Sequence, residues 1–245
     1  MNAPTITAAT LKKLAQYDTP TICNIIELFE VRPFTAGYMD RRIQAAFPEM
    51  PPVVGFAATA SFKSGTPQKN STYAALEAQV AEFAKLPGPG FVVFQDHDNP
   101  PVGATFGEVM CSTYQAFGAV GLITSGGGRD LLQVKSLGFP VFTGCTICSH
   151  AYCQTFDVGA TVEVGGLTVQ SGDLLHGDAN GVTNIPLELA AEIADVADEF
   201  IAAESHVIDY AKAGGPKDVA ELAARRAAMG DALAELRRRV TRRRD

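Results

Sequence analysis

The chain has 245 residues, of which 47% are hydrophobic and 19% charged, and its formal net charge is −7. This length and apolar content suffice for one large domain with a substantial core. Mean hydropathy is near zero, and no apolar run approaches the ~18 residues of a membrane span, so a membrane protein is excluded at this stage. The N-terminus lacks the basic start and apolar core of a signal peptide, and we expect a cytoplasmic protein.

The charge is unevenly distributed along the chain. Residues 215–245 carry nine Lys and Arg against five Asp and Glu, a net of +4, whereas residues 1–214 carry −11. We therefore divide the chain into an acidic body, residues 1–214, and a basic Ala/Arg-rich helical tail, residues 215–245. The arginines of the tail predict a solvated face or a segment lying on another subunit. A nucleic-acid arm is the less favoured alternative, because the body is acidic.

Two helices are predicted first, over residues 7–16 and from Thr19 onward. Asp18 provides a cap for the second helix and Pro20 suits its first turn. The apolar face of this helix is predicted to contain Ile22, Ile25, Ile26 and Phe29. Residues 31–52 are rich in proline and predicted to be irregular. Within them, the pair Arg41 and Arg42 is either surface charge, which we favour, or the lining of a substrate opening.

Residues 53–62 and 91–94 are predicted strands, and residues 71–85 between them are a predicted helix that ends at a Pro-Gly repeat. The second strand runs into Asp96-His97-Asp98. Two acids and a histidine suit a metal site, but the following Asn-Pro-Pro favours an ordinary turn. We favour the turn.

Residues 106–142 are the most informative stretch. They predict a helix from Gly107 to Gly118, whose buried face is expected to contain Val109, Met110, Tyr114 and Phe117. A short apolar strand follows over residues 119–124, then a glycine-rich turn over residues 125–130 and another helix. The strand is expected to pair with residues 140–142.

The turn SGGGRD combines features of an anion site. Its three glycines permit positive φ and close backbone approach. Arg129 offers a planar fork for a carboxylate or phosphate, and Asp130 either caps the next helix or binds a cation. A helix start presents free N–H groups, and the helix that begins at Gly107 adds a second one. We therefore expect an anion site between two helix starts, with a carboxylate near enough to hold a cation.

The rest of the chain alternates strands and turns before two long helices. A hairpin is predicted over residues 161–170 around two glycines, and two more strands over residues 173–185. Pro186 begins a long helix that runs to about Lys212, and residues 214–216 form a linker. The tail helix, residues 217–244, is expected to have an apolar stripe of Leu222, Met229, Leu233 and Leu236.

The five cysteines are Cys23, Cys111, Cys145, Cys148 and Cys153. Their odd number is typical of free thiols in an intracellular protein. The CxxC pair with a nearby histidine suits zinc, but no second CxxC or HxxxH accompanies it. We favour small buried side chains. No dinucleotide fingerprint, P-loop or serine-hydrolase elbow is present.

Three segments together resemble the RraA-like family, which includes the 4-hydroxy-4-methyl-2-oxoglutarate aldolases. They are GE at a helix start followed by AVGLITSGGGRD, then LGFPVF, and finally SGDLLHGDANGVTNIP over residues 171–186. The resemblance extends from about Leu11 to about Gly214. It implies an α/β fold, a swivelling β/β/α domain with helices flanking a central sheet. It also implies a homotrimer or a dimer of trimers with sites between subunits.

The resemblance implies how substrate is bound. Arg129 would bind the carboxylate of a small 2-oxo acid, together with backbone amides at the helix start. These amides belong to Gly107, Glu108, Val109 and Met110.

The resemblance also implies a divalent cation, Mg²⁺ by preference and Mn²⁺ as the alternative. Asp130 would be its one direct protein ligand, and Glu108 would hold one of its waters. An acid of the long C-terminal helix of a neighbouring subunit would hold another water; we choose Glu204, with Glu199 second. Asp96 is kept as a supporting residue behind the site.

The expected activity is that of a metal-dependent lyase of the class II aldolase or decarboxylase type. It would cleave 4-hydroxy-4-methyl-2-oxoglutarate or decarboxylate oxaloacetate, releasing pyruvate through a metal-stabilised enolate. Gln133 and Ser125 replace acids that the family's aldolases usually carry, which indicates a different substrate or weaker aldolase activity. The alternative that the resemblance also implies is a protein-binding regulator of a ribonuclease without catalysis.

Overall fold

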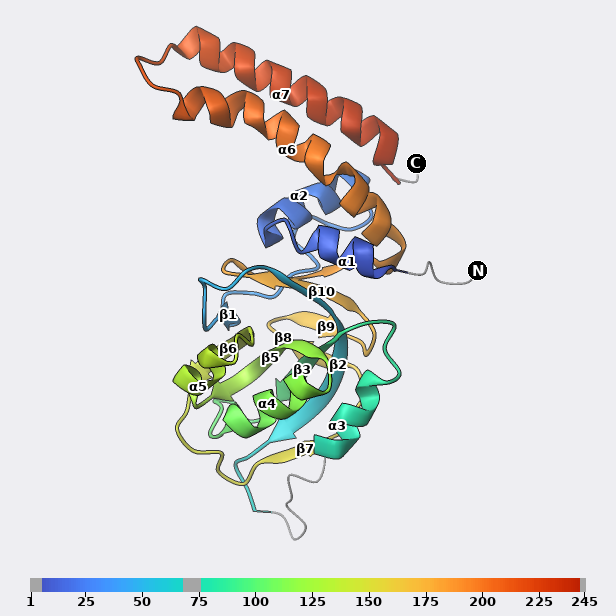
Figure 1. Ribbon diagram of the computed structural model, residues 1–245, viewed down its shortest axis with the longest axis vertical. Helices are drawn as coiled ribbons and strands as arrows, with labels where there is room; N and C mark the ends of the chain where they lie inside the picture. Colours follow the sequence, from blue (N-terminus) through green and yellow to red (C-terminus); the bar gives the residue numbers. More distant parts are fainter. Residues whose placement is uncertain (1–5, 68–75, 243–245) are drawn as a thin grey trace.

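The computed structural model describes residues 6–67 and 76–242, which form a mixed sheet flanked by helices (Figure 1). Four central strands run parallel in the order β6-β5-β3-β2. They are β2 (Val53–Lys63), β3 (Gly90–Asp96), β5 (Ala119–Gly128) and β6 (Val141–Thr146). Antiparallel strands border them: β1 (Gln44–Ala45), β7 (Gln154–Phe156), β10 (Leu174–Asp178) and β11 (Gly181–Ile185). The short β4 (Ala104–Phe106) pairs in parallel with the end of β5.

Each face of the central strands is covered by a different layer. One face packs against three short helices, α3 (Leu76–Phe83), α4 (Glu108–Ala116) and α5 (Leu131–Ser136). The other packs against a hairpin of β8 (Val162–Val164) and β9 (Leu167–Val169). In β3, Val92 and Phe94 join the helical side, and Phe91 and Val93 join the hairpin side. Since both faces are buried there, the strand is apolar from Phe91 to Phe94.

A layer of four helices covers the β10 end of the sheet (Figure 1). They are α1 (Ala8–Leu14), α2 (Thr19–Phe29), α6 (Ala190–Lys212) and α7 (Val219–Val240), with a 3-10 turn, η1 (Leu187–Leu189), before α6. The predicted cap is present, because the Asp18 side chain accepts from the N–H of Thr21. The outer parts of α6 and α7 form an antiparallel arm that extends away from the sheet.

One buried polar contact joins this helical layer to the sheet. The ring of His176 contacts the Thr19 hydroxyl through Nδ1 at 2.9 Å and the Leu14 carbonyl through Nε2 at 3.3 Å. A carbonyl only accepts, so Nε2 carries the proton and Nδ1 accepts from the hydroxyl. Burial lowers the pKa of His176, which favours this neutral form.

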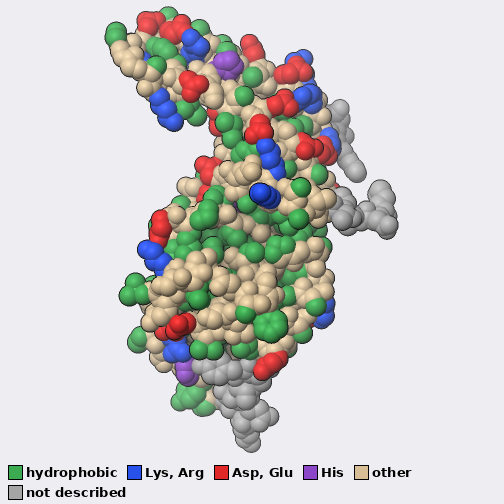
Figure 2. All heavy atoms as spheres, viewed as in Figure 1, with side chains coloured by type: hydrophobic (Ala, Val, Ile, Leu, Met, Phe, Trp, Pro, Cys, Tyr) green, Lys and Arg blue, Asp and Glu red, His purple; other side chains and the backbone are tan. Residues whose placement is uncertain are grey.

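Several arginines in and just after α7 pair with acids of their own chain. Arg239 lies 2.6 Å from Glu199 of α6, Arg242 pairs with Glu192, and Arg237 lies 3.9 Å from Glu30. Figure 2 accordingly shows positive and negative side chains interspersed on the arm. Because the surface of the arm is mixed in charge, this observation counts against the nucleic-acid alternative for the tail.

We expect α7 to contribute to the stability of the body. Leu236 is 3% exposed and lies in the same apolar cluster as α2 and α6. Leu236→Ala should lower the free energy of unfolding by about 3 kcal/mol, the usual cost of such a cavity. The control Leu222→Ala, at a position 37% exposed, should cost less than ~1 kcal/mol. Equal effects in denaturant titrations would show that the tail does not support the body.

The fold class and most predicted elements are confirmed, including the pairing of β5 with β6. The expected buried face of α4 is half wrong. Met110 and Tyr114 are buried, but Val109 is 73% exposed and Phe117 is 62% exposed. The helix ends at Ala116, so Phe117 lies beyond it, and Cys111 takes the buried place given to Val109. Of the predicted helix over 71–85, residues 71–75 lie outside the described residues.

The glycine-rich segment is also not the predicted turn, because β5 continues to Gly128. The glycines at 126–128 do not have positive φ. They are needed for close packing instead: a Cβ atom on Gly128 would lie 2.0 Å from the ring of Phe106. Finally, within the described ranges, no helix has both the length and the apolarity needed to cross a bilayer.

Candidate functional site

The site lies where two chain segments leave the sheet together. β4 runs parallel to the end of β5, with Phe106 opposite Gly128. The backbone N–H of Arg129 donates to the carbonyl of Phe106 at 3.2 Å. The residues after each strand, Gly107 and Glu108 on one side and Arg129 and Asp130 on the other, are therefore neighbours in space, as the sequence predicted.

Asp130 has an unusual backbone. Its φ of 54° and ψ of 36° place it in the left-handed region, and it precedes α5 without capping it through its side chain. Its Oδ2 instead accepts the backbone N–H of Glu108, the first residue of α4, at 3.0 Å. Among the described contacts Oδ1 accepts no hydrogen bond, and the side chain is 37% exposed. The carboxylate is thus held by one oxygen and available through the other.

Gly107 is required by this arrangement. A Cβ atom there would lie 2.6 Å from Oδ2 of Asp130 and 3.2 Å from Nε of Arg129. Such a contact is well inside normal packing distances, so any side chain at this position would displace both functional groups.

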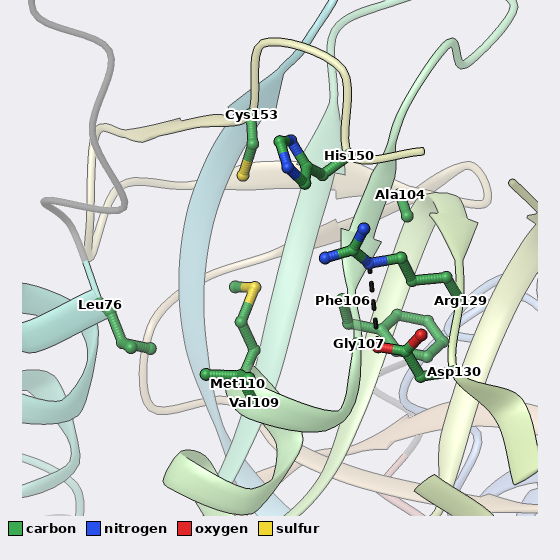
Figure 3. A pocket seen from close by; sticks show the side chains of 10 residues that line it. All are labelled: Leu76, Ala104, Phe106, Gly107, Val109, Met110, Arg129, Asp130, His150 and Cys153. Carbon is green, nitrogen blue, oxygen red and sulfur yellow. Dashed lines mark ion pairs between the residues drawn. The ribbon is translucent and has the colours of Figure 1, made fainter. Parts of the chain in front are cut away.

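Arg129 points into a cavity (Figure 3). Its Nε lies 3.8 Å from Oδ2 of Asp130, and its side chain is 32% exposed. This ion pair is loose, and it leaves the guanidinium available to a carboxylate. The N–H groups of Val109 and Met110, in the first turn of α4, have no acceptor within the helix. The N–H of Glu108 does not belong to this set of open donors, because it donates to Asp130.

The cavity has a volume of about 380 Å³, large enough for a small organic ligand. Arg129, Asp130 and His150 form its polar side. His150 comes from the loop after β6, and its Nδ1–H donates to the carbonyl of Ala151 at 2.8 Å. From the sequence, His150 was considered only for a zinc site, and Cys153 for zinc or, as favoured, as a small buried side chain. Leu76 and Phe106, which also line the cavity, were missed. No local pattern marks them, because they come from separate elements.

The two acids predicted to hold waters of the cation, Glu108 and Glu204, are not among the residues that line this cavity. Glu108 is exposed at the start of α4, and its side chain does not line the cavity. Glu204 lies on α6, near Asp18, and partial burial raises its pKa, with Asp18 as a second cause. The second choice, Glu199, is paired with Arg239. A single chain therefore brings Arg129, Asp130 and the α4 start together, but not Glu204.

The residues that depart from the family pattern have ordinary contacts. Gln133 is exposed on α5. The Ser125 hydroxyl accepts the backbone N–H of Asp96 at 2.8 Å and so ties the end of β3 to β5. Asp96 is the last residue of β3, and its Oδ1 accepts the N–H of Asp98 at 2.9 Å where the chain turns out of the strand, as favoured. Its Oδ2 is buried and has no hydrogen-bond partner among the described residues.

The Asp96 carboxyl should influence stability as a function of pH. Burial raises its pKa to about 6, above the unfolded value of about 4. Between these values the folded state binds more protons, so the free energy of unfolding falls as pH rises. Because the group is only partly buried, we expect a loss of about 1 kcal/mol. Asp96→Asn should remove this loss. Between pH 4 and pH 7 the free energy of unfolding of the variant should therefore rise by about 1 kcal/mol relative to that of wild type.

This gain is measured by denaturant unfolding of both proteins at a series of pH values. His176 acts in the opposite direction in the same pH range, since its pKa is lowered by burial. Only the difference between variant and wild type therefore isolates Asp96. Parallel stability curves would contradict the assignment.

The cysteines are not gathered with other potential metal ligands among the described residues. Within residues 6–67 and 76–242, no group of three or more His, Cys, Asp or Glu side chains is placed to hold a metal ion, which counts against zinc. The favoured alternative, small buried side chains, holds for Cys111 and Cys153. It is wrong for Cys145, which lies in the exposed end of β6, and for Cys148, which lies in the exposed loop after that strand.

Comparison with known sequences agrees with this geometry. A family model described as Aldolase/RraA matches residues 19–183. A protein of Halalkalibacterium halodurans named "Putative 4-hydroxy-4-methyl-2-oxoglutarate aldolase" is 32% identical over 99 residues, which cover 40% of this chain and 47% of that protein. Protein DlpA of Legionella pneumophila is 26% identical over 114 residues, 45% of this chain and 18% of DlpA. The matches thus span less than half of each relative.

Solved structures share the fold. An uncharacterized protein of Pseudomonas syringae superposes with a TM-score of 0.71 at 21% identity, covering 93% of this chain and 97% of that one. RraAS2 of Streptomyces coelicolor superposes with a TM-score of 0.66 at 23% identity, covering 82% of this chain and 96% of that one. It is described as an unusual member of the RNase ES inhibitor RraA protein family. Because the family model covers about two thirds of the chain and spans the whole Arg129–Asp130 site, the protein belongs to the RraA-like family.

Proposed function

We propose that the protein is a divalent-metal-dependent lyase that cleaves a carbon–carbon bond of a 2-oxo acid and releases pyruvate. The observation that carries the proposal is Asp130, a carboxylate on a left-handed backbone, held by the Glu108 N–H beside an available arginine. Such backbone strain is concentrated at functional sites. A purely structural aspartate in this position would be expected to cap its own helix.

The residues present fit a hard divalent cation. Oδ1 of Asp130 is open, and Mg²⁺ is commonly bound through one or two carboxylates while it keeps several waters. Asp130 would hold the ion directly, and Glu108 would hold one of its waters. A cation bound there would supply Lewis-acid stabilisation of the negative charge that develops on the substrate's keto oxygen.

The chain's own groups would bind and orient the substrate. The Arg129 guanidinium would pair with the 2-oxo acid's carboxylate, and the N–H groups of Val109 and Met110 would add two donors. Fixed positive groups at this end stabilise the enolate formed when the bond beside the keto group breaks. Decarboxylation needs only this stabilisation, whereas retro-aldol cleavage also requires removal of a hydroxyl proton.

The test is pyruvate release, coupled to lactate dehydrogenase, from oxaloacetate and from a 4-hydroxy-2-oxo acid. We expect release with Mg²⁺ from at least one of the two classes and its loss in EDTA. Turnover that persists at full rate in EDTA, or no turnover from either class, would contradict the proposal.

The homo-oligomer would complete the site. We propose a trimer or a dimer of trimers in which Glu204 of a neighbouring copy approaches Asp130, because α6 carries Glu204 away from the site of its own chain. Mixing inactive Glu204→Ala and Asp130→Asn proteins, after reversible dissociation, should restore activity, since some sites would then combine both intact residues. If mixtures stay inactive while each protein assembles normally, the shared site is wrong.

The alternative is a protein-binding regulator of a ribonuclease. RraAS2 is described in those terms, but at 23% identity the likeness shows the fold alone. Co-purification with a ribonuclease, and inhibition of it that survives Arg129→Ala, would favour this alternative. The available carboxylate and arginine at the cavity favour the lyase.

A further inference from the structure

The cavity beside Asp130 has two chemically different ends. Arg129 and Asp130 form one end. At the other, the Met110 thioether and the Cys153 thiol point towards each other, with the His150 ring beside Cys153, and Leu76 approaches from α3 (Figure 3). A ligand whose 2-oxo acid group lies on Arg129 would therefore extend its far end into apolar and sulfur-containing side chains.

The two sulfur-containing side chains at this end are buried and uncharged. Met110 is 7% exposed and Cys153 is 8% exposed. Burial raises the pKa of Cys153 to about 11, although Arg129 lowers it, so the thiol is neutral at pH 7. A neutral buried thiol packs as a small apolar group.

Among the described residues at this end, no Lys or Arg would offer a counter-charge to a second carboxylate on the ligand. Among the described residues that line the cavity, Arg129 is the only Lys or Arg, and the 2-oxo acid group occupies it in the proposed mode. Packed against the Met110 and Cys153 side chains, a distal carboxylate would lose its hydration without gaining an ion-pair partner from them, which is unfavourable. A hydrocarbon group would instead gain by leaving water.

We propose, on the basis of the proposed lyase function, that the substrate is a 4-hydroxy-2-oxo monocarboxylate whose distal group is a hydrocarbon seated against Leu76, Met110 and Cys153. In its cleavage the C3–C4 bond breaks and its electron pair forms the enolate of pyruvate. The C4 hydroxyl loses its proton, and C4 becomes the carbonyl carbon of an aldehyde. C3 of the enolate takes up a proton to give pyruvate. The products are pyruvate and an apolar aldehyde, with no oxidant or reductant required.

An isosteric pair of substrates tests this selectivity. In 4-hydroxy-5-methyl-2-oxohexanoate an isopropyl group replaces the distal carboxylate of 4-hydroxy-2-oxoglutarate. With Mg²⁺ and the full chain, we expect kcat/KM for pyruvate release to be at least ~10-fold higher for the isopropyl compound. An equal or higher value for the glutarate would overturn the inference and leave the lyase function intact.

Binding of unreactive analogues separates the two proposals. If neither compound is cleaved and oxaloacetate is not decarboxylated either, the lyase function fails. Calorimetric titration with 5-methyl-2-oxohexanoate and 2-oxoglutarate, each with Mg²⁺, then still tests the cavity. Tighter binding of the apolar analogue by ~10-fold supports the inference, and tighter or equal binding of 2-oxoglutarate overturns it.

Introducing a cation at the apolar end should reverse the preference. Leu76 is only half-buried, so Leu76→Arg is expected to fold, and Met110→Lys provides a second position. Each should raise the glutarate-to-isopropyl ratio of kcat/KM, or of affinity, by ~10-fold or more. Val102→Lys, at an exposed residue outside the cavity wall, adds the same charge and should leave the ratio unchanged. Folded Leu76 and Met110 variants with an unaltered ratio would contradict the assignment.

Discussion

Asp130→Asn should lower metal-dependent pyruvate release by about 100-fold or more. Asparagine is nearly the same size, tolerates the left-handed backbone, and can still accept the Glu108 N–H through its amide oxygen. What it removes is the negative charge at Oδ1, on which a direct cation ligand depends. A 100-fold loss corresponds to about 2.7 kcal/mol of transition-state stabilisation. The measurement is kcat/KM across a Mg²⁺ titration.

The chain offers a matched control for this variant. Asp157 also has a positive φ, 47°, but it is exposed and does not line the cavity. Asp157→Asn therefore makes the same chemical change on a similar backbone and should leave turnover within about twofold of wild type. Equal losses in the two variants would indicate a general effect of the substitution, and full activity in Asp130→Asn would contradict the role of Asp130.

Gly128→Ala adds only one methyl group, yet we expect it to lower the free energy of unfolding substantially. The added Cβ atom would lie 2.0 Å from Cζ and 2.4 Å from Cε1 of the Phe106 ring. Phe106 is 1% exposed within the core beneath α4, so the ring and the β5 backbone cannot both keep their positions once the methyl group is added. Overpacking of this kind costs about 3 kcal/mol, which corresponds to a Tm lower by roughly 5–10 °C for a chain of this length.

Gly230→Ala is the opposite case. Gly230 lies inside α7, and no atom lies within 4 Å of its hypothetical Cβ. Alanine is the better helix former, so this variant should be more stable by about 0.5–1 kcal/mol. Thermal unfolding of the two variants should thus shift in opposite directions. A Gly128→Ala protein as stable as wild type would show that the ring of Phe106 has room to relocate.

The sequence predicted the fold where periodicity or end signals were strong. Asp18 and Pro20 marked the start of α2, and the apolar run of β3 marked a strand buried on both faces. Three-residue strands such as β4 and β7 contain too few positions for a pattern. The segment 125–128 was misread because its glycines serve the packing of Phe106 and other neighbours, and such contacts follow only from the assembled sheet.

The site was predictable in its charged half only. Arg129, Asp130 and the α4 start were recognisable from their order along the chain and the family resemblance. That Oδ2 of Asp130 would bond to the Glu108 N–H depends on the pairing of β4 with β5, which no local signal reveals. Cys153 and Leu76 reach the cavity from segments far apart in the sequence, so its apolar end, and the substrate class it favours, required the structure.

The most direct test of the central claim is Mn²⁺ binding followed by electron paramagnetic resonance on wild type, Asp130→Asn and Asp157→Asn. If Asp130 anchors the cation, wild type and Asp157→Asn will each bind about one Mn²⁺ per chain. Asp130→Asn will then bind it at least ~10-fold more weakly. Unchanged Mn²⁺ affinity in Asp130→Asn would contradict the account, because the cation would then be held elsewhere.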